Sequence, residues 1–283
     1  MKLIKKNDVT FNIKDEDHLP SKTLWDRYTK NEWEPETFTL LDMLVKKGNI
    51  VVDVGTWVGP VSLYAAKKGA TVIGYEPDPI AYNVFQENIK TNPDLIDKIT
   101  VKEKALSNKD EIKSFYAIDK FGHSGASLNN FSKATTEVKV VCRDGYSELK
   151  DIDWEKVCLL KIDIEGGEFI LIPHIKSLLE KHKPNLYLSL HVKQDKKYVR
   201  YGMFFRILKA SIDGMKITYS LRKYKNKFIF TNNKWMRWED LPSQNIKQKI
   251  RNKFLIGYKD AVFCTEKNLN VTDLTQPSKN KLK

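Results

Sequence analysis

The hydrophobic positions between residues 50 and 192 fall into short apolar runs separated by amphipathic stretches. Short apolar runs predict strands at 50–54, 71–75, 99–106, 157–164 and 186–192, and the first is typical of a strand buried on both faces. Apolar residues three or four positions apart predict helices that begin at Pro60, after Asp78 and at Glu168. Strands that alternate with helices in this way predict an α/β fold, with a mostly parallel sheet and helices on both faces.

The rest of the chain is less regular. Further elements are predicted as helices at 35–47 and 198–212, as strands at 112–118, 138–142, 217–221 and 261–265, and as a break near Pro173 in the helix 168–182. The basic and aromatic segment 223–258 gives no clear pattern. We therefore predict a partly helical N-terminal extension at 1–45, one main domain at 46–268 and a polar C-terminal tail at 269–283.

Composition is that of a globular protein. Of the 283 residues, 41% are hydrophobic and 30% are charged. No apolar run approaches the roughly 18 residues of a membrane helix, and the basic start lacks the apolar stretch of a secretory signal. The cysteines Cys142, Cys158 and Cys264 lie far apart in apolar segments, which is typical of reduced core residues and not of a zinc site. We expect a cytoplasmic protein without a transmembrane segment.

The net charge of +13 changes this picture, because it predicts an anionic partner. Nucleic acid, an acidic lipid surface and a phosphorylated or nucleotide-linked sugar all fit such a charge. The lysines are spread along the chain, so composition does not choose among these partners.

The stretch VVDVGTWVGP, residues 51–60, is the most informative loop. A buried strand ends at an acid, Asp53, and Gly55 and Gly59 then bracket a turn into a helix, which is where open α/β sheets bind ligands. A dinucleotide fingerprint would place glycines where Trp57 and Pro60 stand. The loop therefore disfavours NAD, which needs room for a pyrophosphate, and favours S-adenosylmethionine (SAM).

Glu76 lies at the end of the next predicted strand, about 20 residues after the first glycine. At this spacing a carboxylate accepts hydrogen bonds from ribose hydroxyls, and such charge-assisted bonds are strong. The structural alternative is a loop acid that caps the next helix.

Three blocks of the sequence together resemble the FkbM family of SAM-dependent methyltransferases, over roughly residues 50–195. They are VVDVGTWVGPVSLYAAKKGATVIGYEPDP at 51–79, KALSN at 104–108 with GHSGASL at 122–128, and LLKIDIEGGE at 159–168. The family's first loop resembles D-x-G-A-N-x-G, and here Thr56 and Trp57 replace its alanine and asparagine. The resemblance implies a Rossmann-like class I methyltransferase fold and O-methylation of sugars, glycans or other secondary metabolites.

By this resemblance SAM lies over the glycine loop, with its ribose on Glu76 and its adenine near Ala105 and Leu106. The complete predicted cofactor-binding set is Asp53, Gly55, Thr56, Trp57, Gly59, Glu76, Pro77, Ala105, Leu106 and Asp163.

Asp163, Glu165 and Glu168 follow one buried strand, and His191 ends the next. We predict these four as the catalytic residues, because a hydroxyl that attacks a methyl group must lose its proton. Asp163 and Glu165 could instead bind a hard divalent cation such as Mg²⁺, so metal use is left open. Structural alternatives are helix capping by Glu165 or Glu168 and a core position for His191, and His123 could contact the acceptor or the cofactor.

The predicted function is therefore SAM-dependent O-methylation of a sugar or glycan hydroxyl. An RNA methyltransferase is the first alternative, because of the charge and because Lys161 and Asp163 could belong to a Lys-Asp-Lys-Glu set, although its other two members have no obvious place. The basic, aromatic segment 219–238 could bind nucleic acid or sugars, or be an ordinary solvated loop. A non-catalytic binding module, suggested by Trp57, is the second alternative.

Overall fold

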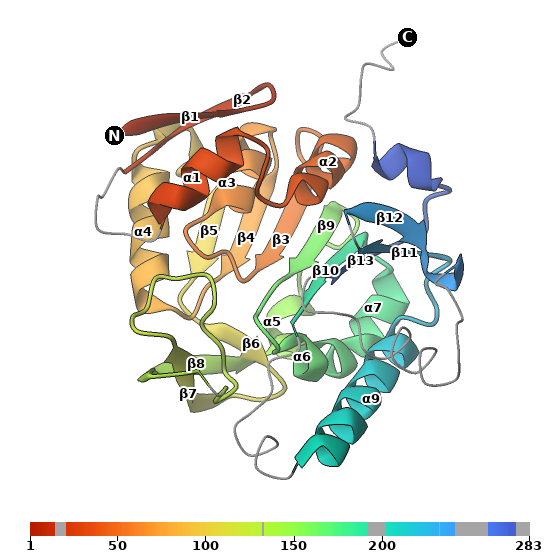
Figure 1. Ribbon diagram of the computed structural model, residues 1–283. Coiled ribbons are helices and arrows are strands. Elements are labelled where there is room, and N and C mark those ends of the chain that lie inside the picture. Colours follow the sequence, from red (N-terminus) through yellow and green to blue (C-terminus); the bar gives the residue numbers. More distant parts are fainter. Residues whose placement is uncertain (15–20, 132, 192–201, 232, 241–259, 276–283) are drawn as a thin grey trace.

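The computed structural model describes residues 1–14, 21–131, 133–191, 202–231, 233–240 and 260–275. An eight-stranded sheet forms its centre, with the strand order β12-β11-β13-β10-β9-β3-β4-β5 (Figure 1). The strands are β3 (Ile50–Val54), β4 (Thr71–Tyr75), β5 (Ile99–Lys102), β9 (Val157–Ile162), β10 (Leu186–Leu190), β11 (Asn226–Thr231), β12 (Lys234–Arg237) and β13 (Asp260–Thr265).

The five strands from β10 to β5 pair in parallel, and β13 is inserted antiparallel between β10 and β11. This pattern confirms the predicted α/β fold with a mostly parallel sheet. It also places the carboxyl ends of β3, β4, β9 and β10 at one edge, where a ligand site is expected.

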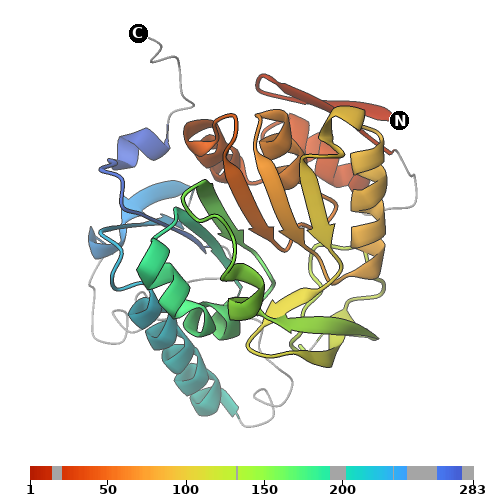
Figure 2. The ribbon, with the colours of Figure 1, turned by 180° about the vertical axis from the view of Figure 1, so that it is seen from behind.

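Helices cover both faces of the sheet, as Figures 1 and 2 show from opposite sides. One face carries α1 (Ser21–Thr29), α2 (Pro35–Leu44), α3 (Pro60–Lys67) and α4 (Pro79–Lys90), and the other carries α5 (Gly145–Leu149), α6 (Glu168–His174), α7 (Lys176–His182) and α9 (Gly202–Ser220). Short 3₁₀ helices are η1 (Pro93–Leu95), η2 (Trp238–Asp240) and η3 (Val271–Leu274).

Neighbouring residues of the central strands face opposite cores, because side chains alternate along a strand. Val51 and Leu159 belong to the core under α1–α4, whereas Val52 and Leu160 belong to the core under α6, α7 and α9. This double burial explains why these strands read as continuous apolar runs.

A second, three-stranded sheet corrects the prediction of one strand at 99–106. That segment divides into β5, in the main sheet, and β6 (Ala105–Ser107), which pairs with β8 (Thr136–Asp144). β7 (Glu111–Ala117) completes the small sheet in the order β6-β8-β7. Apolar character runs through the break because both parts are largely buried, so the pattern alone did not reveal it.

The strand predicted at 217–221 is wrong, because α9 continues through it to Ser220. Ile217 and Leu221 are buried in the same core and are four residues apart, which is helical spacing. The predicted break near Pro173 is present, since the helix ends at His174 and α7 begins at Lys176.

The first residues of the chain form a hairpin, β1 (Lys2–Lys6) with β2 (Val9–Ile13), that the sequence analysis did not foresee. Ile4 and Phe11 of this hairpin lie in the same hydrophobic cluster as α3 and α4. In the part predicted as a tail, Leu274 of η3 is buried in that cluster too. Both end segments thus pack on the main sheet, and the boundaries at 45 and 269 remain predictions.

Parts of other predictions lie outside the described residues, namely the start of the helix at 198–212, the end of the strand at 186–192, and positions 232 and 241–259 of the basic segment. The described part of that basic segment forms β11, β12 and η2. Among the described helices, none is both long enough and apolar enough to cross a membrane.

Candidate functional site

A cavity of about 540 Å³ lies at the carboxyl ends of β3, β4, β9 and β10. Of the predicted site residues, it brings together Asp53, Gly55, Thr56, Trp57, Glu76, Pro77, Ala105, Leu106, Asp163, Glu165 and His191, all of which line its wall. Gly59 and Glu168 are not on that wall. Further lining comes from the N-terminal segment, from the loop after β7, and from residues of β10, β11 and β13.

The glycine loop is shaped by two close approaches. Gly55 has a φ of 90°, and a Cβ there would lie 1.8 Å from the carbonyl oxygen of Asp163. Gly59 also has a φ of 90°, caps the start of α3 and would meet the ring of Phe85 at 2.1 Å. Gly55 therefore lets the loop cross the end of β9, and Gly59 shapes the loop from outside the cavity.

Asp53 is fully buried beneath this loop. Its Oδ2 accepts a 2.7 Å hydrogen bond from the hydroxyl of Ser62, while its Oδ1 accepts none and lies 3.6 Å from Nζ of Lys161. Burial raises the pKa of Asp53, and the positive charge of Lys161 opposes that rise. Thr56, on the same loop, also has a buried hydroxyl without a hydrogen-bond partner.

The carboxylate of Glu76 is held by the backbone. It accepts hydrogen bonds from the amides of Trp57 at 2.7 Å and Asp78 at 2.8 Å, and burial raises the pKa of Glu76 to about 8. Each oxygen keeps a further lone pair, so the group can accept from a ligand while the amides orient it.

Trp57 has a left-handed backbone with a φ of 50°. Its indole Nε1 donates a 2.8 Å hydrogen bond to the carbonyl oxygen of Gly122. The indole is thus tied to the loop after β7, and it forms one wall of the cavity together with Trp33, whose ring centroid is 6.4 Å away.

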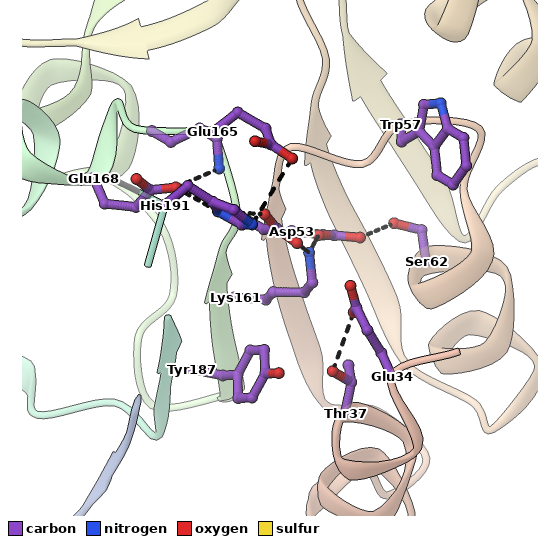
Figure 3. Close-up of polar contacts among 12 residues, drawn as sticks. Glu34, Thr37, Asp53, Trp57, Ser62, Lys161, Glu165, Glu168, Tyr187 and His191 are labelled. Atoms are coloured by element: carbon purple, nitrogen blue, oxygen red, sulfur yellow. Dashed lines mark hydrogen bonds and ion pairs between the residues drawn. The ribbon is translucent and has the colours of Figure 1, made fainter. Parts of the chain in front are cut away.

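His191 lies among three carboxylates (Figure 3). Its Nδ1 is 3.5 Å from Oδ1 of Asp163 and 3.7 Å from Oε1 of Glu168, and its Nε2 is 3.8 Å from Oε1 of Glu165. Burial by itself would lower the pKa of His191, but the three carboxylates outweigh it and raise the pKa to about 10. The ring therefore carries a positive charge at neutral pH.

The predicted cation pair, Asp163 and Glu165, is joined here by His191. One ligand atom from each of the three lies within 4.8 Å of the others, a spacing at which they could share one ion. The imidazolium at the centre of this group already supplies a positive charge.

Glu168 is placed differently from its three neighbours. It is fully buried, and its oxygens accept 2.8 Å hydrogen bonds from the amides of Ile164 and Gly166. Its carboxylate therefore holds the turn after β9, a placement that favours the structural alternative over contact with a substrate.

The loop between β7 and β8 closes over this turn. The hydroxyl of Ser127 donates to the carbonyl oxygen of Glu165 at 2.6 Å, and the Asn129 amide donates to that of Gly166 at 3.3 Å. His123 and Ser124 of the same loop line the cavity.

Sequence reasoning missed Glu34 and Tyr187, and treated Lys161 only as part of an RNA-modifying set. Lys161 is almost fully buried, with Nζ 3.4 Å from Oδ2 of Asp163. Burial lowers its pKa, but the nearby carboxylates, Asp163 first, outweigh this and leave the pKa raised. The available signal was its position two residues before Asp163, at the end of a strand expected to carry the site.

Glu34 precedes α2 and reaches the cavity from the N-terminal segment. Tyr187, in β10, donates a 3.3 Å hydrogen bond from its hydroxyl to Oε1 of Glu36, which lies in α2. Pro35 marks the start of that helix in the sequence, but nothing in the local pattern indicates that this helix packs against the end of β9.

The strand order, in which β13 runs antiparallel between β10 and β11, and the cavity beside the glycine loop define a class I methyltransferase fold. The sequence matches the methyltransferase FkbM domain family over residues 12–212. The chain therefore belongs to the FkbM family, which confirms the resemblance found in the sequence.

Individual relatives are more distant. A ribosomal protein L11 methyltransferase from Chloroflexus aurantiacus is 43% identical over 68 residues, which is 24% of this chain and 20% of that protein. A methyltransferase FkbM from Methylobacillus flagellatus KT is 15% identical, with a TM-score of 0.42, over 77% of this chain and 43% of that one. A geranyl diphosphate methyltransferase in complex with SAM is 10% identical, with a TM-score of 0.45, over 89% of this chain and 93% of that one. The chain thus spans less than half of the length of the first two.

Proposed function

We propose that this protein is a SAM-dependent methyltransferase that transfers the methyl group to a hydroxyl of a sugar or glycan. The observation that carries the proposal is that one cavity is lined both by Glu76, poised to accept from a ribose, and by Asp163, Glu165 and His191, which can handle a proton. Family membership supports the cofactor.

The residues present fit SAM. Glu76 offers a pre-oriented carboxylate for ribose hydroxyls, and Pro77, Ala105 and Leu106 offer apolar contacts for an adenine. Asp53 supplies a buried oxygen that accepts no hydrogen bond. When bound, SAM would supply a methyl group activated by its positively charged sulfur, and the carboxylates of this cavity favour such a cation.

The task of the chain is to align the acceptor hydroxyl and to take its proton. Alignment can contribute up to about 7–11 kcal/mol in ideal cases, and a positioned base commonly adds about 10²–10⁴ in rate. His191 holds its proton at neutral pH, so we assign the role of base to the carboxylates of Asp163 and Glu165 beside it. The positive charge of the His191 ring stabilises the negative charge that the two carboxylates share.

An acceptor with a ring and hydroxyl groups suits the remaining walls. Trp33, Trp57 and Phe230 line the cavity with aromatic surface, against which the apolar faces of a sugar ring can pack. The net charge of +13 favours an acceptor with a phosphate or other anionic group, such as a nucleotide-linked sugar.

The test is a transfer assay with methyl-labelled SAM and a panel of nucleotide sugars, neutral glycans and RNA. We expect label on a sugar substrate, and loss of transfer in Asp163→Asn. Transfer to RNA alone, with affinity that falls steeply as salt rises, would assign the RNA alternative instead. Absence of SAM binding by calorimetry would point to the non-catalytic module.

A further inference from the structure

The N-terminal segment delivers a carboxylate into the cavity. Glu34 stands just before α2 with a left-handed backbone, φ 43° and ψ 52°, which is strained for a residue with a Cβ. Its side chain makes no capping hydrogen bond to the helix backbone, although capping is the usual role of a polar side chain there. Instead it extends toward Lys161 and Asp53 and accepts a 3.3 Å hydrogen bond from the hydroxyl of Thr37 (Figure 3).

Carboxylates outnumber cations where Glu34 enters. Asp53, Asp163 and Glu34 lie around the ammonium of Lys161, and each of the three favours the charged form of that lysine. Burial raises the pKa of Glu34 to about 8, repulsion from Asp163 adds to the rise, and Lys161 and His191 oppose it. Three carboxyl groups thus surround one buried cation here, and a second cation would favour the ionised form of Glu34.

A second observation points to a missing partner at the same place. Asp53 lines the cavity, and its buried Oδ1 accepts no hydrogen bond, with the ammonium of Lys161 3.6 Å away. A buried carboxylate oxygen that is not hydrogen-bonded is costly, so a donor from a ligand would relieve it. A positively charged donor would relieve Glu34 and Asp53 together.

The proposed cofactor carries such a donor. At neutral pH the methionine part of SAM ends in an α-ammonium, which offers three hydrogen bonds and a positive charge. Glu76 and the apolar residues beside it account for the nucleoside, and Glu34 lies beyond the glycine loop on the wall formed by Asp53 and Lys161. The methionine end of SAM would therefore lie against the wall that carries Glu34 and Asp53.

We propose that Glu34 is a cofactor-binding residue, whose carboxylate accepts hydrogen bonds from the α-ammonium of SAM, with Asp53 and Asp163 completing an anionic pocket around it. Lys161 is the internal counter-charge that allows these carboxylates to stand close together. This inference rests on the cofactor part of the proposed function. It makes the segment before residue 46 a part of the cofactor site.

The test compares two ligands by calorimetry on the full chain. They are S-adenosylhomocysteine and its analogue in which hydrogen replaces the α-amino group. We expect the unmodified protein to bind S-adenosylhomocysteine roughly 10- to 100-fold more tightly than the analogue, as a hydrogen bond to a charged group suggests. Glu34→Gln, which keeps the shape but removes the charge, should bind the two about equally.

Glu155→Gln is the matched control, because it removes the same charge from an exposed position that does not line the cavity. This variant should keep the preference of the unmodified protein. Thermal unfolding of each variant shows that the fold is retained. If Glu34→Gln does not fold, the ligand pair on the unmodified protein still tests the anionic pocket, because equal binding would overturn it.

Equal binding of both ligands by the unmodified protein overturns the inference and leaves the proposed function intact. So does a preference that survives in Glu34→Gln. Failure of the unmodified protein to bind S-adenosylhomocysteine at all overturns the proposed function and this inference with it.

Discussion

The hydroxyl of Ser127 donates a 2.6 Å hydrogen bond to the carbonyl oxygen of Glu165. This bond joins the loop between β7 and β8 to the turn that carries the acidic cluster. Glu165 has a left-handed backbone, with a φ of 54°, so its conformation depends on such support. Two segments nearly forty residues apart in sequence thus fix one side of the cavity together.

Removal of this hydroxyl is the first prediction. Ser127 is fully buried, so Ser127→Ala leaves the Glu165 carbonyl without its donor and should lower the free energy of unfolding by about 1–3 kcal/mol. Urea unfolding measures this change. Ser114→Ala, which removes a hydroxyl bonded to the exposed Lys139, should change it by less than about 0.5 kcal/mol. If both substitutions lowered the free energy of unfolding equally, the hydrogen bond from Ser127 to Glu165 would contribute no more to stability than an exposed one.

Gly55 and Gly48 make a matched pair for the second prediction. Both have positive φ, 90° and 85°, but an added Cβ meets the Asp163 carbonyl at 1.8 Å in the first and nothing within 4 Å in the second. Gly48→Ala should therefore cost only the backbone strain, about 1–2 kcal/mol. Gly55→Ala should cost more than about 3 kcal/mol, because β3 and β9 must move apart. Thermal or urea unfolding compares them, and similar costs would contradict the close approach of this loop to β9.

The third prediction concerns Glu76 and separates its role from that of Glu34. Glu76→Gln replaces one oxygen by an amide that faces a backbone N–H, so one of the two orienting hydrogen bonds is lost. We expect binding of both S-adenosylhomocysteine and 5′-methylthioadenosine to weaken by roughly 10- to 100-fold, since both contain the ribose. Calorimetry measures both affinities. Weakening of S-adenosylhomocysteine alone would place Glu76 away from the ribose.

The pH dependence of transfer is the fourth prediction. His191 has a pKa of about 10, well above its usual 6.5, so its imidazolium persists across the neutral range. If a carboxylate takes the proton, the rate should change little between pH 7 and 9 and should fall as His191 loses its charge near pH 10. A rate that rises tenfold per pH unit up to pH 10 would instead make neutral His191 the base.

The raised pKa of His191 also makes the free energy of unfolding depend on pH. A group whose pKa is raised in the folded state contributes stability that is fully present below its usual pKa, 6.5, and is lost as the pH rises through about 10. Unfolding free energies of the unmodified protein and of His191→Asn should therefore differ most below pH 6.5 and converge toward pH 10. A difference that does not depend on pH would contradict the raised pKa.

The fifth prediction concerns divalent cations. Asp163 and Glu165 already share the positive charge of His191, and a metal ion would have to displace the proton of that ring. We expect transfer to continue after treatment with EDTA and to gain less than about twofold from added Mg²⁺. Loss of activity in EDTA that Mg²⁺ restores would assign the cluster to a metal.

The sequence by itself determined the parallel sheet, the glycine turn after β3 and the family. Strands buried on both faces leave an unbroken apolar run, and Gly55 and Gly59 mark a turn in which both residues have positive φ. These features are local, because each depends on a few consecutive residues whose backbone or burial dictates their type. The two-residue repeat of a strand does not explain the meeting of Asp163 and Glu165, because β9 ends at Ile162 and Glu165 has a left-handed backbone.

Only the tertiary structure decided which distant groups meet. The entry of Glu34 into the cavity, the ring of carboxylates around Lys161 and the raised pKa of His191 all arise where segments far apart in sequence converge. The tertiary structure also divided 99–106 between two sheets and made 217–220 helical. A short apolar run can be buried equally well as a strand or as a helix, so its sequence does not distinguish the two. Electrostatic energies depend on distances between side chains, and folding alone sets those distances.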